Sequence, residues 1–372
     1  MKKIKKFFTL LLIYSFFIII GDFIFSNFTN FGKINYNCFQ YFNLDHKKDK
    51  FHYYDLKKNC SATESQRTVS PYKVFIDNNG YRYSGKKRDD FKNKILFAGD
   101  SQTYGYGVKY QDSFPGIVAS KNTDYEIYNL GVPGYGIRMY WNRVEDFFNQ
   151  NNNITHVIVT IDMTDIIDLA YSWQEIPSTK YPVIKSHHVK KEIDSWDKIK
   201  DSNFKGFRLL TFYLRNLMRS TKNKLIDNYD INKDTSLKSE IANFTYTDLS
   251  QHSILDKIKF EKALNDIDKY YGKIAKISSE NNAKPYLLIF PWPENLIYGQ
   301  SNFNWENFAV SVCEKHKCEK MINLFDKFNI IKDENNNWKQ LIFIDDDIHL
   351  KKFGNSIVAN EIQKVLQEQT RR

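Results

Sequence analysis

Short apolar runs without polar alternation recur from residue 94 onward, and longer amphipathic segments separate them. A strand covered on both faces of a sheet reads as a continuous apolar run, whereas a surface helix repeats its apolar positions at helical spacing. Strands are expected at residues 95–98, 125–131, 156–162 and 286–290, and helices at 137–148, 260–281, 305–315 and 351–369. This alternation predicts a right-handed, three-layer α/β domain over residues 94–372.

Two segments depart from that alternation. Residues 26–93 form an amino-terminal extension with short β elements, such as Tyr72–Ile76, and we expect the extension to pack beside the sheet. Residues 169–254 are rich in Lys, Asp, Tyr and Trp and are too long for an ordinary crossover. Because this insertion follows the end of a strand, we interpret it as a lid or substrate-binding insertion. A merely solvated excursion is the alternative.

The amino end joins a lysine-rich head to an apolar run from Phe7 to Ile20, which resumes at Phe23–Phe25 after Gly21 and Asp22. A basic head before an apolar stretch is typical of an export signal. Residues 1–25 are predicted to be an uncleaved signal anchor, a transmembrane helix. The protein would then be single-pass in the inner (cytoplasmic) membrane, with its remainder periplasmic. Cleavage after Ser26 is the alternative, although Ile24 is bulky where a small residue is preferred.

Composition excludes several classes of protein. A hydrophobic content of 42% is enough for a substantial core, while 15 glycines and 8 prolines exclude a fibrous or low-complexity chain. The net charge is +10, but no element carries a basic stripe interleaved with aromatic residues, so nucleic acid is not an expected partner. An acidic envelope polymer or anionic lipid fits this charge better.

Ser101 follows the apolar run at residues 95–98 directly, within the sequence Gly99-Asp100-Ser101. Gly99 lets the chain turn sharply at the carboxyl end of the strand, where α/β proteins place their ligands. A serine hydroxyl is a weak nucleophile unless a base takes its proton, and His349 near the carboxyl end offers one. Asp346, three residues before His349, is expected to accept a hydrogen bond from Nδ1 of that ring.

Other interpretations of these residues are weaker. The Gly99–Gly107 turn lacks the Gly-Lys-Ser/Thr ending of a phosphate loop. The Asp345–Asp347 run suits a helix cap or a cation, but a calcium site brings more oxygen ligands at regular spacing. Since no Cys-x-x-Cys pair or histidine array suggests zinc, neither a metal nor a cofactor is expected.

The Gly99-Asp100-Ser101 and Asp346-x-x-His349 motifs together resemble the first and last blocks of the SGNH hydrolase superfamily, the GDSL-type esterases. Tyr128–Gly136 resembles the second block, with Gly134 at its oxyanion position. The third block departs from the family pattern, because Asp162-Met163-Thr164-Asp165 stands where Gly-x-Asn-Asp is usual. Order and separation of the blocks match the family over roughly residues 94–368.

The resemblance implies the SGNH hydrolase fold, a three-layer α/β/α sandwich with a mostly parallel, flavodoxin-like sheet. It implies a triad of Ser101, His349 and Asp346, and an oxyanion hole formed by backbone N–H groups of Ser101 and Gly134 with Thr164 as a third donor. The implied function is a serine esterase for O-acyl, chiefly O-acetyl, esters of cell-envelope glycans or lipids. The alternatives are a glycan O-acetyltransferase, for which an acyl-donating membrane partner is unknown, and a catalytically reduced glycan-binding protein.

Four cysteines fit an oxidising compartment. Cys38 and Cys60 bracket one aromatic- and lysine-rich stretch, and Cys313 and Cys318 lie close together in the sequence. Of the three connectivities that four cysteines allow, we expect Cys38–Cys60 and Cys313–Cys318.

Overall fold

The computed structural model describes residues 2–28, 38–44, 51–66, 69–86, 93–121, 124–150, 153–169, 173–174, 183–185, 206–207, 210, 257–300, 303–345 and 347–370. The chain divides into two compact units. One unit comprises Met1–Tyr36 with Ser186–Lys233, and the other comprises Asn37–Lys185 with Asp234–Arg372. The second unit carries Ser101 and His349.

A mostly parallel sheet forms the centre of the second unit, which confirms the predicted α/β class. Its parallel strands are β6 (Asn93–Ala98), β7 (Tyr125–Asn129), β8 (His156–Thr160), β11 (Lys284–Ile289) and β12 (Lys320–Asn323). They lie in the order β12-β11-β8-β6-β7, with β6 pairing in parallel with both β7 and β8. In chain order this is the flavodoxin-like arrangement, whose topological switch point lies between β6 and β8.

Part of the amino-terminal extension, between residues 60 and 83, continues this sheet. Its strands are β3 (Cys60–Gln66), β4 (Val69–Ile76) and β5 (Arg82–Tyr83). They pair antiparallel with one another, and Arg82 of β5 pairs with Asn129 of β7. The turn between β4 and β5 is tightened by Asp77, whose Oδ1 accepts from the backbone N–H groups of Asn79 and Tyr81. Three strands therefore extend the sheet on the β7 side.

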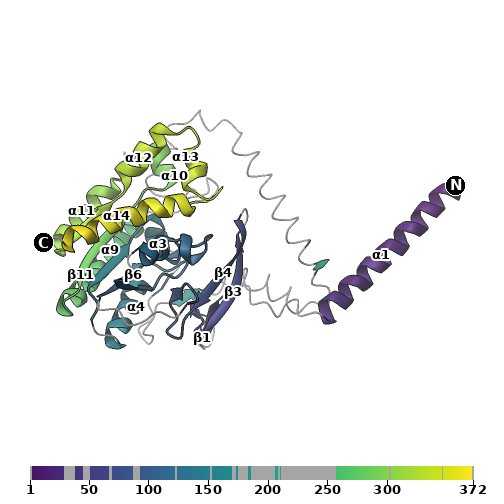
Figure 1. Ribbon diagram of the computed structural model, residues 1–372, viewed down its shortest axis with the longest axis horizontal. Helices are drawn as coiled ribbons and strands as arrows, with labels where there is room; N and C mark the ends of the chain where they lie inside the picture. Colours follow the sequence, from purple (N-terminus) through teal and green to yellow (C-terminus); the bar gives the residue numbers. More distant parts are fainter. Residues whose placement is uncertain are drawn as a thin grey trace. The chain divides into compact units, whose positions relative to one another are not determined.

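Helices cover both faces of the sheet. They are α2 (Ser101–Tyr104), the 3-10 helix η1 (Tyr110–Asp112), α3 (Phe114–Lys121), α4 (Ile137–Gln150), α5 (Met163–Ile167), α9 (Lys257–Glu280), α10 (Pro293–Tyr298), α11 (Trp305–Lys315), α12 (Phe325–Glu334), α13 (Trp338–Ile342) and α14 (Lys352–Thr370). α3 packs against α14, and α4 packs against α9. Figure 1 shows α14 beside α3, which completes one of the two helical layers.

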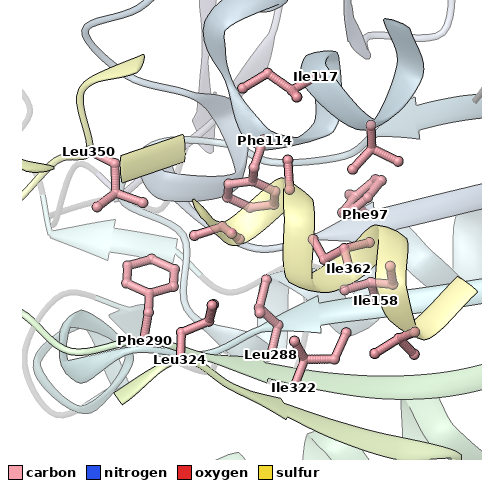
Figure 2. Close-up of a cluster of buried hydrophobic side chains, with 14 of the residues drawn as sticks. Phe97, Phe114, Ile117, Ile158, Leu288, Phe290, Ile322, Leu324, Leu350 and Ile362 are labelled. Carbon is pink, nitrogen blue, oxygen red and sulfur yellow. The ribbon is translucent and has the colours of Figure 1, made fainter. Parts of the chain in front are cut away.

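An apolar cluster lies between the sheet and the α3–α14 layer. Phe97 and Ile158 project from adjacent strands towards Phe114 of α3 and Ile362 of α14 (Figure 2). All four side chains are buried. Leu96, the neighbour of Phe97, is also buried, and successive strand residues point to opposite faces. Both faces of β6 are therefore covered, as its unbroken apolar sequence predicts.

A second, four-stranded sheet joins the extension to the start of the insertion. Its strands are β1 (Phe39–Leu44), β2 (Phe51–Leu56), β9 (Trp173–Gln174) and β10 (Val183–Lys185), in the order β1-β2-β10-β9. β10 pairs antiparallel with β2. The lid expected at residues 169–254 lies mostly outside the described residues, so its role stays a prediction.

Both expected disulfides are present. Cys38 bonds Cys60 with 5.7 Å between their Cα atoms, and Cys313 bonds Cys318 with 5.0 Å between theirs. The first bridge links the segment before β1 to the start of β3, and the second closes the turn after α11.

The other unit contains α1 (Lys2–Phe28). Asp22 near its carboxyl end accepts hydrogen bonds from the backbone N–H groups of Gly206 and Phe207, each at 2.8 Å. The sequence predicts a transmembrane helix at residues 1–25. Among the described residues, however, there is no helix with the length and apolar character needed to cross a membrane.

Candidate active site

Ser101 begins a helix immediately after a buried strand of the sheet. The chain turns at Gly99, where a Cβ atom would meet the side chain of Thr103 and would lie 3.3 Å from Cβ of Thr160. Asp100 caps α2, because its Oδ1 accepts from the backbone N–H of Gln102 at 2.9 Å. The helix ends at Gly105, whose φ of +83° is a left-handed conformation that glycine adopts easily. Ser101 is thus held at the carboxyl end of β6, beside the switch point.

His349 lies against Ser101 although it comes from the other end of the unit. His349 Nε2 is 2.8 Å from Ser101 Oγ. The histidine belongs to the loop between α13 and α14, which is closed by a bridge between Phe343 and Leu350 and by a hydrogen bond from Ile344 N to His349 O. The side chain of Gln102 donates to the Ile348 carbonyl at 3.1 Å and ties this loop to α2.

Among the described residues, the carboxylate that contacts the His349 ring belongs to Asp347, next to the expected Asp346. His349 Nδ1 is 2.6 Å from Asp347 Oδ1. The same oxygen accepts from the backbone N–H groups of Ile348 at 2.7 Å and His349 at 3.2 Å, so the tight loop turns Asp347 towards the ring. Asp346 itself lies outside the described residues. Burial alone would raise the pKa of Asp347, but the hydrogen bond and positive charge of His349 hold that pKa below its ordinary value.

The second block lies beside the nucleophile turn. Asn129 Nδ2 donates to the Thr103 carbonyl at 2.8 Å, and Asn129 Oδ1 accepts from Gly131 N at 2.9 Å. Further along, Gly134 has a φ of +75°, and a Cβ atom there would be 2.5 Å from Tyr54 Oη. Tyr54 of β2 donates to the Pro133 carbonyl at 2.8 Å. The second sheet therefore contacts the loop that contains Gly134.

Thr164 lies at the end of β8, across from the Ser101 turn. Asp162 caps α5, with its Oδ1 accepting from Thr164 N at 2.7 Å, and Asp165 Oδ2 accepts from Asp162 N at 3.0 Å. The Thr164 hydroxyl is hydrogen-bonded to Asp162 Oδ1 and lies 3.0 Å from Asp100 Oδ2. Its hydroxyl is therefore engaged by two carboxyl groups, which the sequence alone did not indicate.

Three buried carboxyl groups thus gather at the ends of β6 and β8. Asp100, Asp162 and Asp165 are 3%, 2% and 0% exposed. Burial and the neighbouring charge of Asp100 raise the pKa of Asp162 to about 8. Burial, with the charges of Asp162 and Asp100, raises the pKa of Asp165 well above its ordinary value. Burial also raises the pKa of Asp100, against the opposing effects of the Gln102 N–H and His349.

The extension holds the loop that follows α2 through Arg82, which the sequence analysis missed. Arg82 is 1% exposed, and its guanidinium donates to the carbonyls of Tyr104 at 2.5 Å, Gly105 at 2.6 Å and Val108 at 2.6 Å. Its Cζ lies 4.4 Å from the centroid of the Tyr104 ring. A lone arginine in a short strand gives no such signal in the sequence, because its partners are backbone carbonyls.

Glu64 of β3 completes this buried network. Its carboxyl oxygens accept from the hydroxyls of Tyr72 at 2.9 Å and Tyr104 at 2.8 Å. The Tyr72 hydroxyl in turn accepts from Gly107 N at 3.0 Å. Burial raises the pKa of Glu64, while the charge of Arg82 opposes that rise. The loop at residues 104–108 is thus fixed by three strands of the extension.

Tyr106 projects from that loop onto His349. The centroids of the two rings are 4.7 Å apart, with an angle of 48° between the ring planes. The extension therefore reaches the imidazole indirectly, through the loop and the Tyr106 ring. Within the described part of the chain, no cluster of three or more His, Cys, Asp or Glu residues is arranged to hold a metal ion.

Comparisons with known proteins find similarity only among solved structures. No protein-family model matches the chain, and no curated protein matches it either. A psychrotrophic esterase from Pseudoalteromonas sp. is similar at 12% identity and a TM-score of 0.40, covering 75% of this chain and 100% of its own. An acetylxylan esterase from Geobacillus stearothermophilus is similar at 12% identity and a TM-score of 0.38. This match covers 74% of this chain and 94% of that one.

A third similar structure is a member of the lipolytic G-D-S-L family from Veillonella parvula. It is 11% identical with a TM-score of 0.36, and the match covers 74% of this chain and 98% of that one.

Proposed function

We propose that this protein is a serine ester hydrolase in which Ser101 is the nucleophile, His349 the general base and Asp347 the group that orients the base. The observation that carries this proposal is the continuous chain of contacts from Ser101 Oγ to His349 Nε2, at 2.8 Å, and from His349 Nδ1 to Asp347 Oδ1, at 2.6 Å. Both distances are within hydrogen-bonding range, and their order is that of a nucleophile activated by an oriented base.

The reaction follows from these contacts. His349 Nε2 takes the Ser101 proton while Oγ attacks the ester carbonyl, and the carboxylate of Asp347 stabilises the resulting imidazolium. The imidazolium then gives its proton to the leaving alcohol oxygen, so that the acyl group stays on Ser101. In the second half, His349 takes a proton from water, the hydroxide oxygen attacks the acyl carbon, and Ser101 regains its proton as the acid departs.

The tetrahedral intermediates need donors for their oxyanion. We assign this role to the backbone N–H groups of Ser101 and Gly134, which belong to neighbouring segments tied together through Asn129. Thr164 was expected to add a third donor. Its hydroxyl already contacts Asp100 and Asp162, so we do not assign it to the oxyanion hole.

The proposed substrates are O-acyl, chiefly O-acetyl, esters of cell-envelope glycans or lipids, reached outside the cytoplasm. Support comes from the basic and apolar amino end and from the two disulfides, a bond type that persists in oxidising compartments. Native protein labelled with a maleimide before reduction should show no free thiol. Four reactive thiols in freshly isolated protein would contradict the proposed location outside the cytoplasm.

The test of the activity is covalent labelling with a fluorophosphonate probe, followed by hydrolysis of p-nitrophenyl acetate. Wild-type protein should be labelled at Ser101, and Ser101→Ala and His349→Ala should each lose hydrolysis by about three orders of magnitude or more. Because the two residues act as a unit, the double variant should be little worse than either single one.

Matched controls come from the same unit. Ser311→Ala changes an exposed serine of α11, and His316→Ala removes a histidine that pairs with Asp268 at 2.9 Å. Both should retain labelling and turnover. Equal labelling of wild type and Ser101→Ala would overturn the proposed function.

A further inference from the structure

The Thr164 hydroxyl lies between two carboxyl oxygens but has one proton to donate. It contacts Asp162 Oδ1 on one side and Asp100 Oδ2, at 3.0 Å, on the other. A hydroxyl donates one hydrogen bond and an ionised carboxylate donates none. If both carboxyl groups were ionised, one of the two contacts would place oxygen lone pairs against each other. The geometry therefore requires a second proton within this group of three residues.

Other contacts restrict where that proton lies. Asp100 Oδ1 is already occupied by the Gln102 N–H, and Asp162 Oδ1 also accepts from Thr164 N. The titratable groups facing the three residues are Asp165 from α5, Tyr140 from α4 and His349 from the loop before α14, and Asp168, just after α5, faces Asp165 and Tyr140. The Trp292 side chain, ahead of α10, lies near Asp162.

These surroundings favour a protonated Asp162. Asp162 is buried beside the carboxyl group of Asp100, and a second negative charge in a buried site is costly. The raised pKa of Asp162, about 8, agrees with a proton on this carboxyl group at neutral pH.

The group of three residues also touches the Ser101 hydroxyl. Ser101 Oγ is 2.8 Å from His349 Nε2 but also 3.1 Å from Asp100 Oδ2. The two acceptors compete for one hydroxyl proton, and only a proton directed at Nε2 is placed for transfer to the base. An Asp100 oxygen that already accepts a hydrogen bond from Thr164 is a weaker competitor.

We propose that Asp162, Thr164 and Asp100 share one additional proton, and that this proton directs the Ser101 hydroxyl towards His349. Asp162 donates to Thr164 Oγ1, Thr164 donates to Asp100 Oδ2, and the Ser101 hydroxyl donates to His349 Nε2. When the proton leaves to solvent, Thr164 turns to Asp162, and Asp100 becomes free to accept from Ser101. Asp162 and Thr164 are positioning residues, and the proposal rests on the proposed function through Ser101.

The first measurement detects the proton without any need for activity. Full-length protein labelled with ¹³C-aspartate is titrated by infrared spectroscopy, which separates the C=O stretch of a protonated carboxyl group from the bands of a carboxylate. Wild type at neutral pH should show the protonated band, Asp162→Asn should lose part of it, and Thr164→Val should shift it. Asp345→Asn, which changes an exposed carboxylate paired with Lys351, should leave it unchanged.

The second measurement follows kcat and KM for ester hydrolysis against pH. Wild type should lose kcat at alkaline pH as the shared proton leaves, with KM little changed. Asn at position 162 keeps an oxygen to cap α5 but brings no carboxyl proton, so Asp162→Asn should lower kcat by roughly tenfold at neutral pH and lose this alkaline decline. Thr164→Ser keeps the hydroxyl and should show the wild-type dependence of kcat on pH. Thr164→Val has no hydroxyl and should not.

The outcomes separate this proposal from the proposed function. A wild-type protein without a protonated aspartate band at neutral pH, or a band identical in Asp162→Asn, would overturn the shared proton. If kcat of Asp162→Asn still declined at alkaline pH as in the wild type, the shared proton would have no influence on Ser101. If the band behaves as expected but no fluorophosphonate label appears, the hydrolase function fails while the shared proton stands.

Discussion

Asp347 Oδ1 lies 2.6 Å from His349 Nδ1 and accepts, in addition, from two backbone N–H groups of its own loop. The carboxylate is therefore held in place before any substrate arrives. Its lowered pKa means that the group stays ionised to a lower pH than an ordinary aspartate, so it can stabilise an imidazolium across the neutral range.

Replacing Asp347 should distinguish its role from those of the neighbouring Asp345 and Asp346. Asp347→Asn removes the negative charge opposite His349 and permits the wrong imidazole tautomer, so kcat should fall by about three to four orders of magnitude. The matched controls are Asp345→Asn and Asp346→Asn, measured with the same ester. A loss confined to Asp346→Asn would restore the spacing expected from the sequence, and equal losses at all three positions would instead favour a cation site.

Arg82 should be needed for both stability and turnover. Arg82→Lys keeps the charge, but a lysine cannot reproduce the planar fork that reaches three carbonyls. Leaving buried carbonyls without donors should lower the free energy of unfolding by about 2 to 4 kcal/mol, measured by urea denaturation.

The control for Arg82 is Arg138→Lys, because the Arg138 guanidinium of α4 lies over the ring of Tyr270 in α9. It should retain kcat, while Arg82→Lys should lose part of it through the loop at residues 104–108. If Arg82→Lys had the stability of the wild type, the hydrogen bonds from Arg82 to the three carbonyls would not stabilise the fold.

The parallel sheet could be predicted from the sequence because buried strands such as β6 and β8 are apolar on both faces. The same logic places the residues after β6 and β8 at one edge of the sheet. It was incomplete for the extension: the expected strand Tyr72–Ile76 lies within β4, but β3 and β5 carry polar residues such as Glu64 and Arg82. Those residues are buried only because each finds partners on another segment. Sequence spacing suggested Asp346, but hydrogen bonds within the loop turn Asp347 to the imidazole.

The buried carboxyl groups should make stability fall as pH rises. Asp162 has a pKa of about 8 in the folded protein and an ordinary value of 3.8 when unfolded. Between these values the folded state holds a proton that the unfolded chain has released, so the free energy of unfolding decreases with increasing pH. Asp162→Asn should flatten this slope in urea titrations from about pH 5 to pH 8. An identical slope in the variant would show that other groups produce it.

Tyr106 should affect turnover through the orientation of His349. Its ring packs against the imidazole with centroids 4.7 Å apart, and the loop that carries it is held by Arg82 and Tyr72. Tyr106→Ala removes this contact and leaves the imidazole freer to tilt away from Ser101, so kcat should fall by about tenfold to a hundredfold. Tyr106→Phe retains the ring and should keep most of the activity.

The measurement for Tyr106 is the rate of fluorophosphonate labelling together with kcat and KM for a small ester. A small ester is used because a positioning effect should then appear in kcat and in the labelling rate, with KM little changed. Tyr270→Ala, on α9, is the matched control and should behave as wild type. If Tyr106→Ala changes KM alone, the ring contacts substrate and does not orient the base. If Tyr106→Phe is as impaired as Tyr106→Ala, the hydroxyl and not the ring carries the effect.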